Sequence, residues 1–139
     1  MPSVKIIKNQ SPDKGLRESV RLGVEAAEGE AAYYMFFHCD EPFLDTDTVR
    51  RIVDEREPGF IVEPCYKNSS DCASGRPGNP CLFSGVFREE LLSLREGETP
   101  RIIKNRHAKA VKTVEVFNSL TLRDIDNEED LKSAREALQ

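Results

Sequence analysis

The stretch Tyr33-Tyr34-Met35-Phe36-Phe37-His38-Cys39-Asp40-Glu41-Pro42 decides the fold. It opens with an apolar, aromatic run that is too short for an ordinary helix and is typical of a strand buried on both faces of a parallel sheet. We therefore expect Met35, Phe36 and Phe37 in the core. Pro42 cannot continue a central strand, so Asp40 should lie at the carboxyl end of this strand, where open α/β sheets bind their ligands. The alternative is that Asp40 caps the following turn or helix.

The composition is that of one globular domain over residues 1–139, with 38% hydrophobic and 32% charged residues. No apolar run is long enough to span a membrane, and Met1–Lys5 has no signal-peptide core, so we expect a cytoplasmic protein. The net charge of −5 argues against a nucleic-acid partner. The spacing of Cys39, Cys65, Cys72 and Cys81 matches no common zinc pattern, which favours reduced thiols over a disulfide or a loop metal.

Strand-like and helix-like segments alternate along the chain. Apolar residues at helical spacing predict helices from Leu16, from Asp45 or Thr46, around Leu91, and after a cap at Asn127. The strands expected beside the Tyr33 run are Val4–Ile7, Phe60–Val62, Pro80–Phe83 and Lys109–Val116. For Pro80–Phe83 the alternative is a turn into a helix. This alternation predicts the α/β class with a mostly parallel sheet flanked by helices. A long polar loop, Tyr66–Asn79, interrupts the pattern and is of a length that is usually functional or mobile.

Four pieces of the chain, taken in order, carry a family resemblance. They are Gly15-x-x-x-Ser19-Val20-Arg21, Cys39-Asp40-Glu41-Pro42-Phe43-Leu44, Gly78-Asn79-Pro80-Cys81-Leu82-Phe83 and Asp124-Ile125-Asp126-Asn127-Glu128-Glu129-Asp130-Leu131. Together they resemble the MobA-like nucleotidyltransferases, in particular the molybdenum cofactor cytidylyltransferase branch. The stretch Gly97-Glu98-Thr99-Pro100-Arg101 looks like a degraded form of that family's G-D-x-G-x-R motif. The fold implied is a three-layer, truncated form of the nucleotide-diphospho-sugar-transferase fold.

The resemblance implies an activity and a set of site residues. Members transfer a nucleotidyl group from an NTP, here CTP or GTP, to a phosphorylated acceptor such as molybdopterin and release pyrophosphate. Asp40 matches the catalytic Mg²⁺ ligand, a role that suits a carboxylate because Mg²⁺ prefers hard oxygen ligands. Asp124 and Asp126 are candidates for a second metal-binding acid, although Asp126 is at least as well explained as a helix cap. The expected nucleotide-binding positions are Asn9, Gly15, Ser19, Gly78, Asn79, Pro80 and Arg101; for the first three, the alternative is an ordinary helix start.

One departure from the family pattern concerns the phosphate loop. Nothing in the chain corresponds to the glycine-rich stretch L-A-A-G-x-S-x-R-x-G-x-x-K, whose backbone N–H groups wrap the triphosphate. The chain starts about where the third strand of the family starts. We therefore expect the isolated chain to be catalytically impaired or to need a partner chain. Two alternatives remain: a non-catalytic binding or regulatory subunit that keeps the acceptor-side surface, and an unrelated α/β domain whose acids are caps.

The missing strands also bear on assembly. In the family, two strands lie between the strand that matches Val4–Ile7 and the strand that matches Tyr33–Phe37. Without them the Tyr33 strand would expose an edge of backbone donors and acceptors, which is a template for pairing. We expect either that Val4–Ile7 moves in beside it or that a second copy or another subunit covers the edge.

Overall fold

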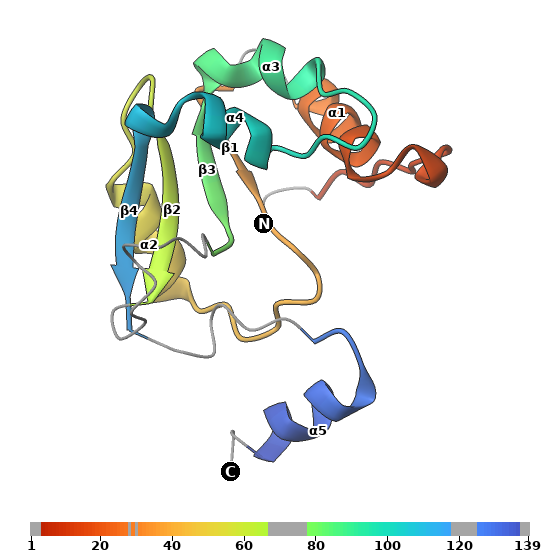
Figure 1. The fold of residues 1–139 in the computed structure, drawn as a ribbon, viewed down its shortest axis with the longest axis vertical. Coiled ribbons are helices and arrows are strands. Elements are labelled where there is room, and N and C mark those ends of the chain that lie inside the picture. The colour runs from red at the N-terminus through yellow and green to blue at the C-terminus, as the bar shows by residue number, and fades with distance from the viewer. Residues whose placement is uncertain (1–3, 28, 30, 67–77, 118–124, 137–139) are drawn as a thin grey trace. The chain divides into compact units, whose positions relative to one another are not determined.

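The computed structural model describes residues 4–27, 29, 31–66, 78–117 and 125–136. Its helices and strands, shown in Figure 1, are α1 (Leu16–Ala26), β1 (Tyr33–Phe36), α2 (Thr46–Asp54), β2 (Ile61–Tyr66), β3 (Cys81–Ser84), α3 (Arg88–Leu92), α4 (Arg101–Arg106), β4 (Val111–Val116) and α5 (Glu128–Glu136). Short 3₁₀ helices occupy Pro12–Lys14 (η1), Gly85–Phe87 (η2) and Ala108–Ala110 (η3). Strands thus alternate with helices, and the predicted α/β class is confirmed.

The strands form one four-stranded sheet in the order β1-β3-β2-β4. β3 runs against its two neighbours. The N–H of Ser84, at the end of β3, bonds to the carbonyl of Phe60, just before β2, and the N–H of Gly78, before β3, bonds to the carbonyl of Pro64 inside β2. This reversed order of contacts is that of antiparallel pairing. β1, β2 and β4 point the same way (Figure 1), so the sheet is mixed, with β3 as the reversed strand.

The chain divides into two compact units. The first comprises residues 1–34, 57–61 and 83–111, and the second comprises residues 35–56, 62–82 and 112–139. In the first unit α1 packs against α3, and the core is formed by apolar side chains that are almost inaccessible to solvent: Val20, Val24, Tyr34, Ile61, Phe83, Phe87, Leu91, Leu94 and Ile103.

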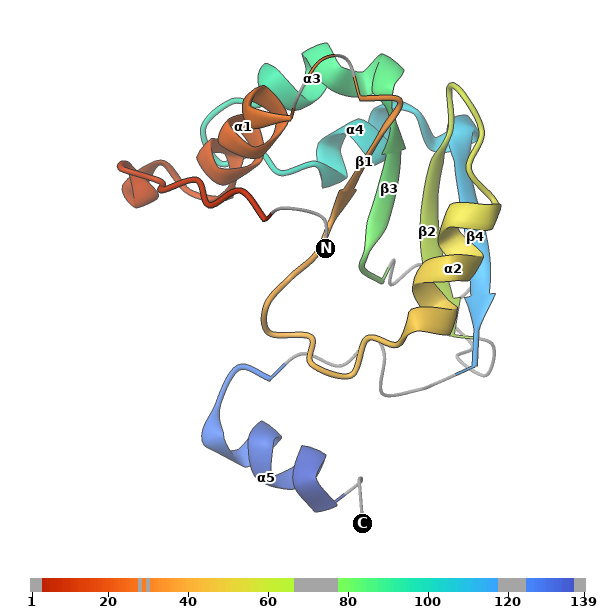
Figure 2. The ribbon, with the colours of Figure 1, turned by 180° about the vertical axis from the view of Figure 1, so that it is seen from behind.

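The second unit contains α2, which lies against one face of β2 and β4 (Figure 2). Ile52 of α2 is fully buried with Val62 and Val116, and Arg51 places its guanidinium carbon 4.8 Å from the ring centre of Phe117. Asp45 begins α2 as its N-cap, accepting a 2.7 Å hydrogen bond from the N–H of Thr48. A capped start followed by a buried isoleucine is the pattern that predicted this helix.

A tight junction joins the end of β3 to the start of β1 in the first unit. The N–H of Gly85 donates a 2.7 Å hydrogen bond to the carbonyl of Ala32. A Cβ atom at Gly85 would clash with the carbonyl oxygen of Ala31. Glycine is therefore required here for close approach between two backbone segments.

The expected burial of the aromatic run is wrong in part. Tyr34 is buried, but Met35 and Phe36 are only half-buried and Phe37 is 55% exposed. The physical reason is that β1 is the outermost strand on its side of the sheet, whereas the prediction assumed a central strand covered on both faces.

The predicted strand Val4–Ile7 is also wrong. This segment belongs to neither a helix nor a strand, and the side chains of Val4 and Ile6 are 89% and 90% exposed. Strand propensity alone does not form a strand, because a β-strand needs a hydrogen-bonded neighbour.

Smaller differences follow from local packing. β2 continues through Pro64 to Tyr66 instead of stopping, and Pro64 is fully buried. Leu131 of α5 is exposed rather than buried, whereas Ala134 is buried as expected. Cys65 is disulfide-bonded, which corrects the expectation of a reduced thiol, while Cys39 and Cys81 form no disulfide. The polar loop lies largely outside the described residues. Within the described part of the chain, no helix is long and apolar enough to cross a membrane.

Candidate functional site

Asp40 lies in the turn that follows β1, in the second unit. It is half-buried, and its Oδ1 atom is inaccessible to solvent and has no hydrogen-bond partner among the described residues. The alternative was that Asp40 caps the following turn or helix; for the helix it is wrong, because Asp45 is the N-cap of α2. A buried carboxylate oxygen without a donor is costly unless a proton or a cation satisfies it.

A hydrogen-bonded cluster fastens the Gly78-Asn79-Pro80 stretch to the residues around Asp40. The Asn79 side chain donates a 2.9 Å hydrogen bond to Oε1 of Glu41, and the same nitrogen lies 3.5 Å from Nδ1 of His38. Glu41 is buried, and the peptide bond between Asn79 and Pro80 is cis. The structure thus brings together two segments that the sequence separates by almost forty residues.

Sequence reasoning did not single out Glu41 and His38. Glu41 directly follows the candidate metal ligand, and no role was assigned to it from the sequence. The sequence signal that could have pointed to them was Asn79 in the Gly-Asn-Pro stretch, because a side-chain amide that is held in place needs a hydrogen-bond acceptor nearby.

A backbone hydrogen bond joins the motif that contains Ile125 to Asp40. The N–H of Ile125 donates a 2.9 Å bond to the carbonyl of Asp40. Asp124 lies outside the described residues. Asp126 is exposed, and its N–H bonds to Oδ2 of Asp130, while Asn127 caps α5 through a 2.9 Å bond from the N–H of Asp130. The predicted cap at Asn127 is confirmed. The helix cap that was the alternative role of Asp126 is therefore supplied by Asn127.

The fit of a metal ion can be judged from these donors. No group of three or more His, Cys, Asp or Glu side chains in the described residues is arranged to hold an ion. Mg²⁺ does not require such a cage, since it keeps several waters and is commonly held by one or two carboxylates together with substrate phosphates. The unsatisfied Oδ1 of Asp40 fits a site of that open kind.

The remaining candidate residues lie in the first unit. The Asn9 side chain donates a 3.1 Å hydrogen bond to Oγ of Ser19 and accepts a 2.8 Å bond from the N–H of Ser11. Gly15, at the N-cap of α1, has a φ of 75°, which glycine adopts without strain. Asn9, Gly15 and Ser19 are thus gathered around the start of α1, while Arg101 is the first residue of α4 and is exposed.

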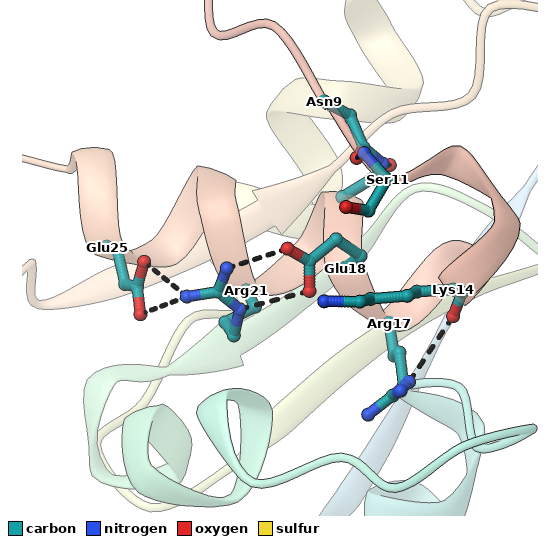
Figure 3. A network of polar contacts seen from close by, with 8 residues as sticks. Asn9, Ser11, Lys14, Arg17, Glu18, Arg21 and Glu25 are labelled. Carbon is teal, nitrogen blue, oxygen red and sulfur yellow. Dashed lines mark hydrogen bonds and ion pairs between the residues drawn. The ribbon is translucent and has the colours of Figure 1, made fainter.

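The exposed face of α1 carries an ion-pair network (Figure 3). Arg21 contacts Glu18 at 2.7 Å and Glu25 at 2.6 Å, three and four residues away on the same face. The hydrogen bond from Arg21 lowers the pKa of the Glu18 carboxyl below its ordinary value. The two carboxylates raise the pKa of Arg21, so its guanidinium stays charged and paired within this helix.

Comparison with known proteins agrees with the resemblance at the family level. The family model described as "MobA-like NTP transferase domain" matches residues 1–111. No curated protein sequence matches the chain significantly.

Solved structures share the fold at low sequence identity. Rv0371c from Mycobacterium tuberculosis H37Rv superposes with a TM-score of 0.70 at 22% identity, over 86% of this chain and 59% of that chain. Its homologue from Mycobacterium sp. strain JC1 gives 0.67 at 16% identity, over 86% and 57%. Rv0371c in complex with manganese gives 0.68 at 23% identity, over 85% and 59%. The chain therefore spans somewhat more than half the length of these proteins.

Proposed function

Because this chain belongs to the MobA-like NTP transferase domain family, we propose that it takes part in nucleotidyl transfer from an NTP to a phosphorylated acceptor. In that reaction an acceptor phosphate oxygen forms a bond to the α-phosphorus, the bond between the α- and β-phosphates breaks, and pyrophosphate leaves. The observation that supports this most is the unsatisfied Oδ1 of Asp40, beside which two of the other three motif segments are hydrogen-bonded, one to Glu41 and one to Asp40 itself.

Each motif segment has a role in this proposal. Asp40 holds the metal ion, with Asp124 or Asp126 as the second acid. When bound, Mg²⁺ would supply charge neutralisation for the triphosphate and orientation for an in-line displacement. The bond from Asn79 to Glu41 holds the Gly-Asn-Pro stretch at the residue next to Asp40. In the second unit that stretch would contact the nucleotide. In the first unit, the resemblance alone makes Asn9, Gly15, Ser19 and Arg101 candidate nucleotide-binding positions.

The substrate class is inferred from the resemblance. We propose CTP or GTP as the donor and a molybdopterin-like molecule as the acceptor. A manganese complex of Rv0371c is consistent with a divalent ion in a protein of this fold.

The 139-residue chain contains no glycine-rich phosphate loop, so we propose that on its own it transfers nucleotidyl groups poorly and works with a second copy or another subunit. The same observation favours a second candidate function, a non-catalytic subunit that keeps the acceptor-side surface. Turnover separates the two: the first function requires pyrophosphate release when the partner is supplied, and the second excludes it.

Metal binding tests the role of Asp40. Titration with Mn²⁺, followed by electron paramagnetic resonance with and without CTP or GTP, should show a bound ion in the wild-type chain and a loss of at least about tenfold in affinity in Asp40→Asn. Asp47→Asn is the matched control, since Asp47 is an exposed acid on α2, and it should bind as the wild type does. Equal Mn²⁺ binding by Asp40→Asn and the wild type would overturn the assignment.

A further inference from the structure

His38 lies in the second unit, between the end of β1 and the Asp40 turn. Its side chain is 41% exposed, and the proposed function gives it no role. Between Leu22 and Val49 no other side chain carries an N–H group, because that stretch contains no lysine, arginine, asparagine, glutamine or tryptophan. The one nitrogen side chain of this stretch is thus two residues from the unsatisfied carboxylate.

The Asn79 amide is oriented by contacts at both of its ends. Its Oδ1 lies 4.0 Å from the thiol sulfur of Cys81, and its Nδ2 donates the 2.9 Å hydrogen bond to Oε1 of Glu41. Because a carboxylate accepts hydrogen bonds, the nitrogen of the amide rather than its oxygen faces Glu41. An amide nitrogen carries two N–H groups, which leaves one for Nδ1 of His38, 3.5 Å away.

The position of Asn79 selects the tautomer of His38. In a neutral imidazole one nitrogen carries the proton and the other accepts. The Asn79 nitrogen beside Nδ1 is a donor, whereas Oε1 of Glu41 is 3.9 Å from Nδ1, beyond hydrogen-bonding distance. Nδ1 is therefore the accepting atom, and the proton lies on Nε2. Nε2 has no hydrogen-bond partner in the part of the chain that the structure describes, so its N–H is open to a ligand.

We propose that the Nε2–H group of His38 donates a hydrogen bond to a phosphate oxygen of the substrate that the metal ion at Asp40 holds. Mg²⁺ with few protein ligands takes phosphate oxygens into its remaining positions, and a neighbouring N–H donor can bind another oxygen of the same phosphate. The inference rests on the proposed function and deepens it. His38 becomes a substrate-binding residue, and Asn79 and Glu41 become positioning residues that act through its ring.

The same geometry argues against His38 as a ligand of the ion itself. A metal-bound imidazole nitrogen has lost its proton, and the other ring nitrogen usually donates its own proton to a carboxylate or a carbonyl. Here Nδ1 faces the donor group of Asn79, so the arrangement that metal binding needs is disfavoured. A phosphate oxygen, by contrast, accepts from a protonated Nε2.

The ¹⁵N chemical shifts of the chain's two histidines test the tautomer, at a pH at which both rings are neutral. We expect the proton of His38 on Nε2. Asn79→Ala should move protons to Nδ1, because Glu41 then lacks this donor and its Oε1 is 3.9 Å from Nδ1. His107, whose Nε2 pairs with Glu90, should not change. A proton on Nδ1 of His38 in the wild type, or a tautomer that Asn79→Ala leaves unchanged, would overturn this inference and leave the proposed function standing.

Phosphate binding is measured by NMR titration of the full chain with Mg²⁺ present. Tripolyphosphate is the probe for the NTP, and glycerol 1-phosphate is the probe for the phosphorylated acceptor. The probe that binds should shift the Nε2–H signal of His38, and His38→Leu should bind it about tenfold more weakly, since a hydrogen bond to a charged oxygen is lost. His38→Gln keeps an N–H donor and should recover part of the affinity. His107→Leu is the matched control and should bind as the wild type does. Equal binding by the wild type and His38→Leu would overturn the inference.

Mn²⁺ binding without phosphate separates this inference from the proposed function. His38→Leu should bind Mn²⁺ as tightly as the wild type does, whereas Asp40→Asn should not. A loss of Mn²⁺ affinity in a folded His38→Leu chain would make His38 a ligand of the ion and overturn the phosphate contact. A wild type that binds neither Mn²⁺ nor either phosphate probe would overturn the proposed function together with the inference.

Discussion

The N–H of Ile125 donates a 2.9 Å hydrogen bond to the carbonyl oxygen of Asp40. Neither side chain takes part, yet the bond sets Ile125 beside the turn that carries the unsatisfied Oδ1 of Asp40. The two residues are 85 positions apart. Because a backbone hydrogen bond does not depend on the side chains, the residue types in the sequence do not reveal it. The candidate site is therefore organised through main-chain contacts as much as through its acids.

Removal of the Asn79 amide should destabilise the second unit. Asn79→Ala takes away a 2.9 Å donor from the buried carboxylate of Glu41, and loss of a hydrogen bond to a buried charged group costs about 1–3 kcal/mol. Urea unfolding measures the change. Asn105→Ala, at an exposed position on α4, is the control and should have little effect. If the two variants are equally stable, the bond to Glu41 contributes nothing.

A methyl group at Gly85 should be poorly tolerated. Gly85→Ala places a Cβ against the carbonyl of Ala31 at the β3–β1 junction, so we expect a loss of about 1–3 kcal/mol in the free energy of unfolding. Gly23→Ala is the matched control, because Gly23 lies inside α1 with open space around it and should gain up to about 1 kcal/mol. Effects of the same sign at both sites would contradict the close approach.

The Arg21 network should make α1 sensitive to acid. The pKa of Glu18 is lowered in the folded chain, chiefly by its hydrogen bond from Arg21, so its contribution to stability is present above the ordinary value of 4.5 and is lost as the pH falls through the lower folded value. Arg21→Gln should therefore be less stable than the wild type at pH 7, and the difference should shrink below pH 4.5. Thermal unfolding at several pH values measures this.

Arg17→Gln is the control for the acid prediction. The Arg17 side chain donates to the carbonyl of Lys14, which does not titrate, and its charge is the smallest of the influences that lower the pKa of Glu18 (Figure 3). The effect of Arg17→Gln should therefore change much less with pH than the effect of Arg21→Gln. A constant difference between the wild type and Arg21→Gln across the acid range would show that Glu18 does not depend on Arg21.

Several elements could be predicted from the sequence because their signals are local. The stripe of Val20 and Val24 in α1, the Asp45 cap of α2, the Asn127 cap of α5 and the alternation of β4 each depend on residues within one or two turns or strand repeats. The family followed from four short motifs in order, and the match over residues 1–111 confirms it.

Tertiary structure alone decided where those elements pair. The aromatic run at Tyr33 reads as a buried central strand, yet β1 lies at the sheet edge and leaves Phe37 exposed. Val4–Ile7 has strand composition and forms no strand within its own chain. Glu41 has no role assigned from the sequence, yet it is buried and accepts a hydrogen bond from Asn79. Composition encodes which segments can form strands and helices, whereas sheet position, strand direction and the burial of a charge depend on contacts between residues far apart in the chain, which no local pattern contains.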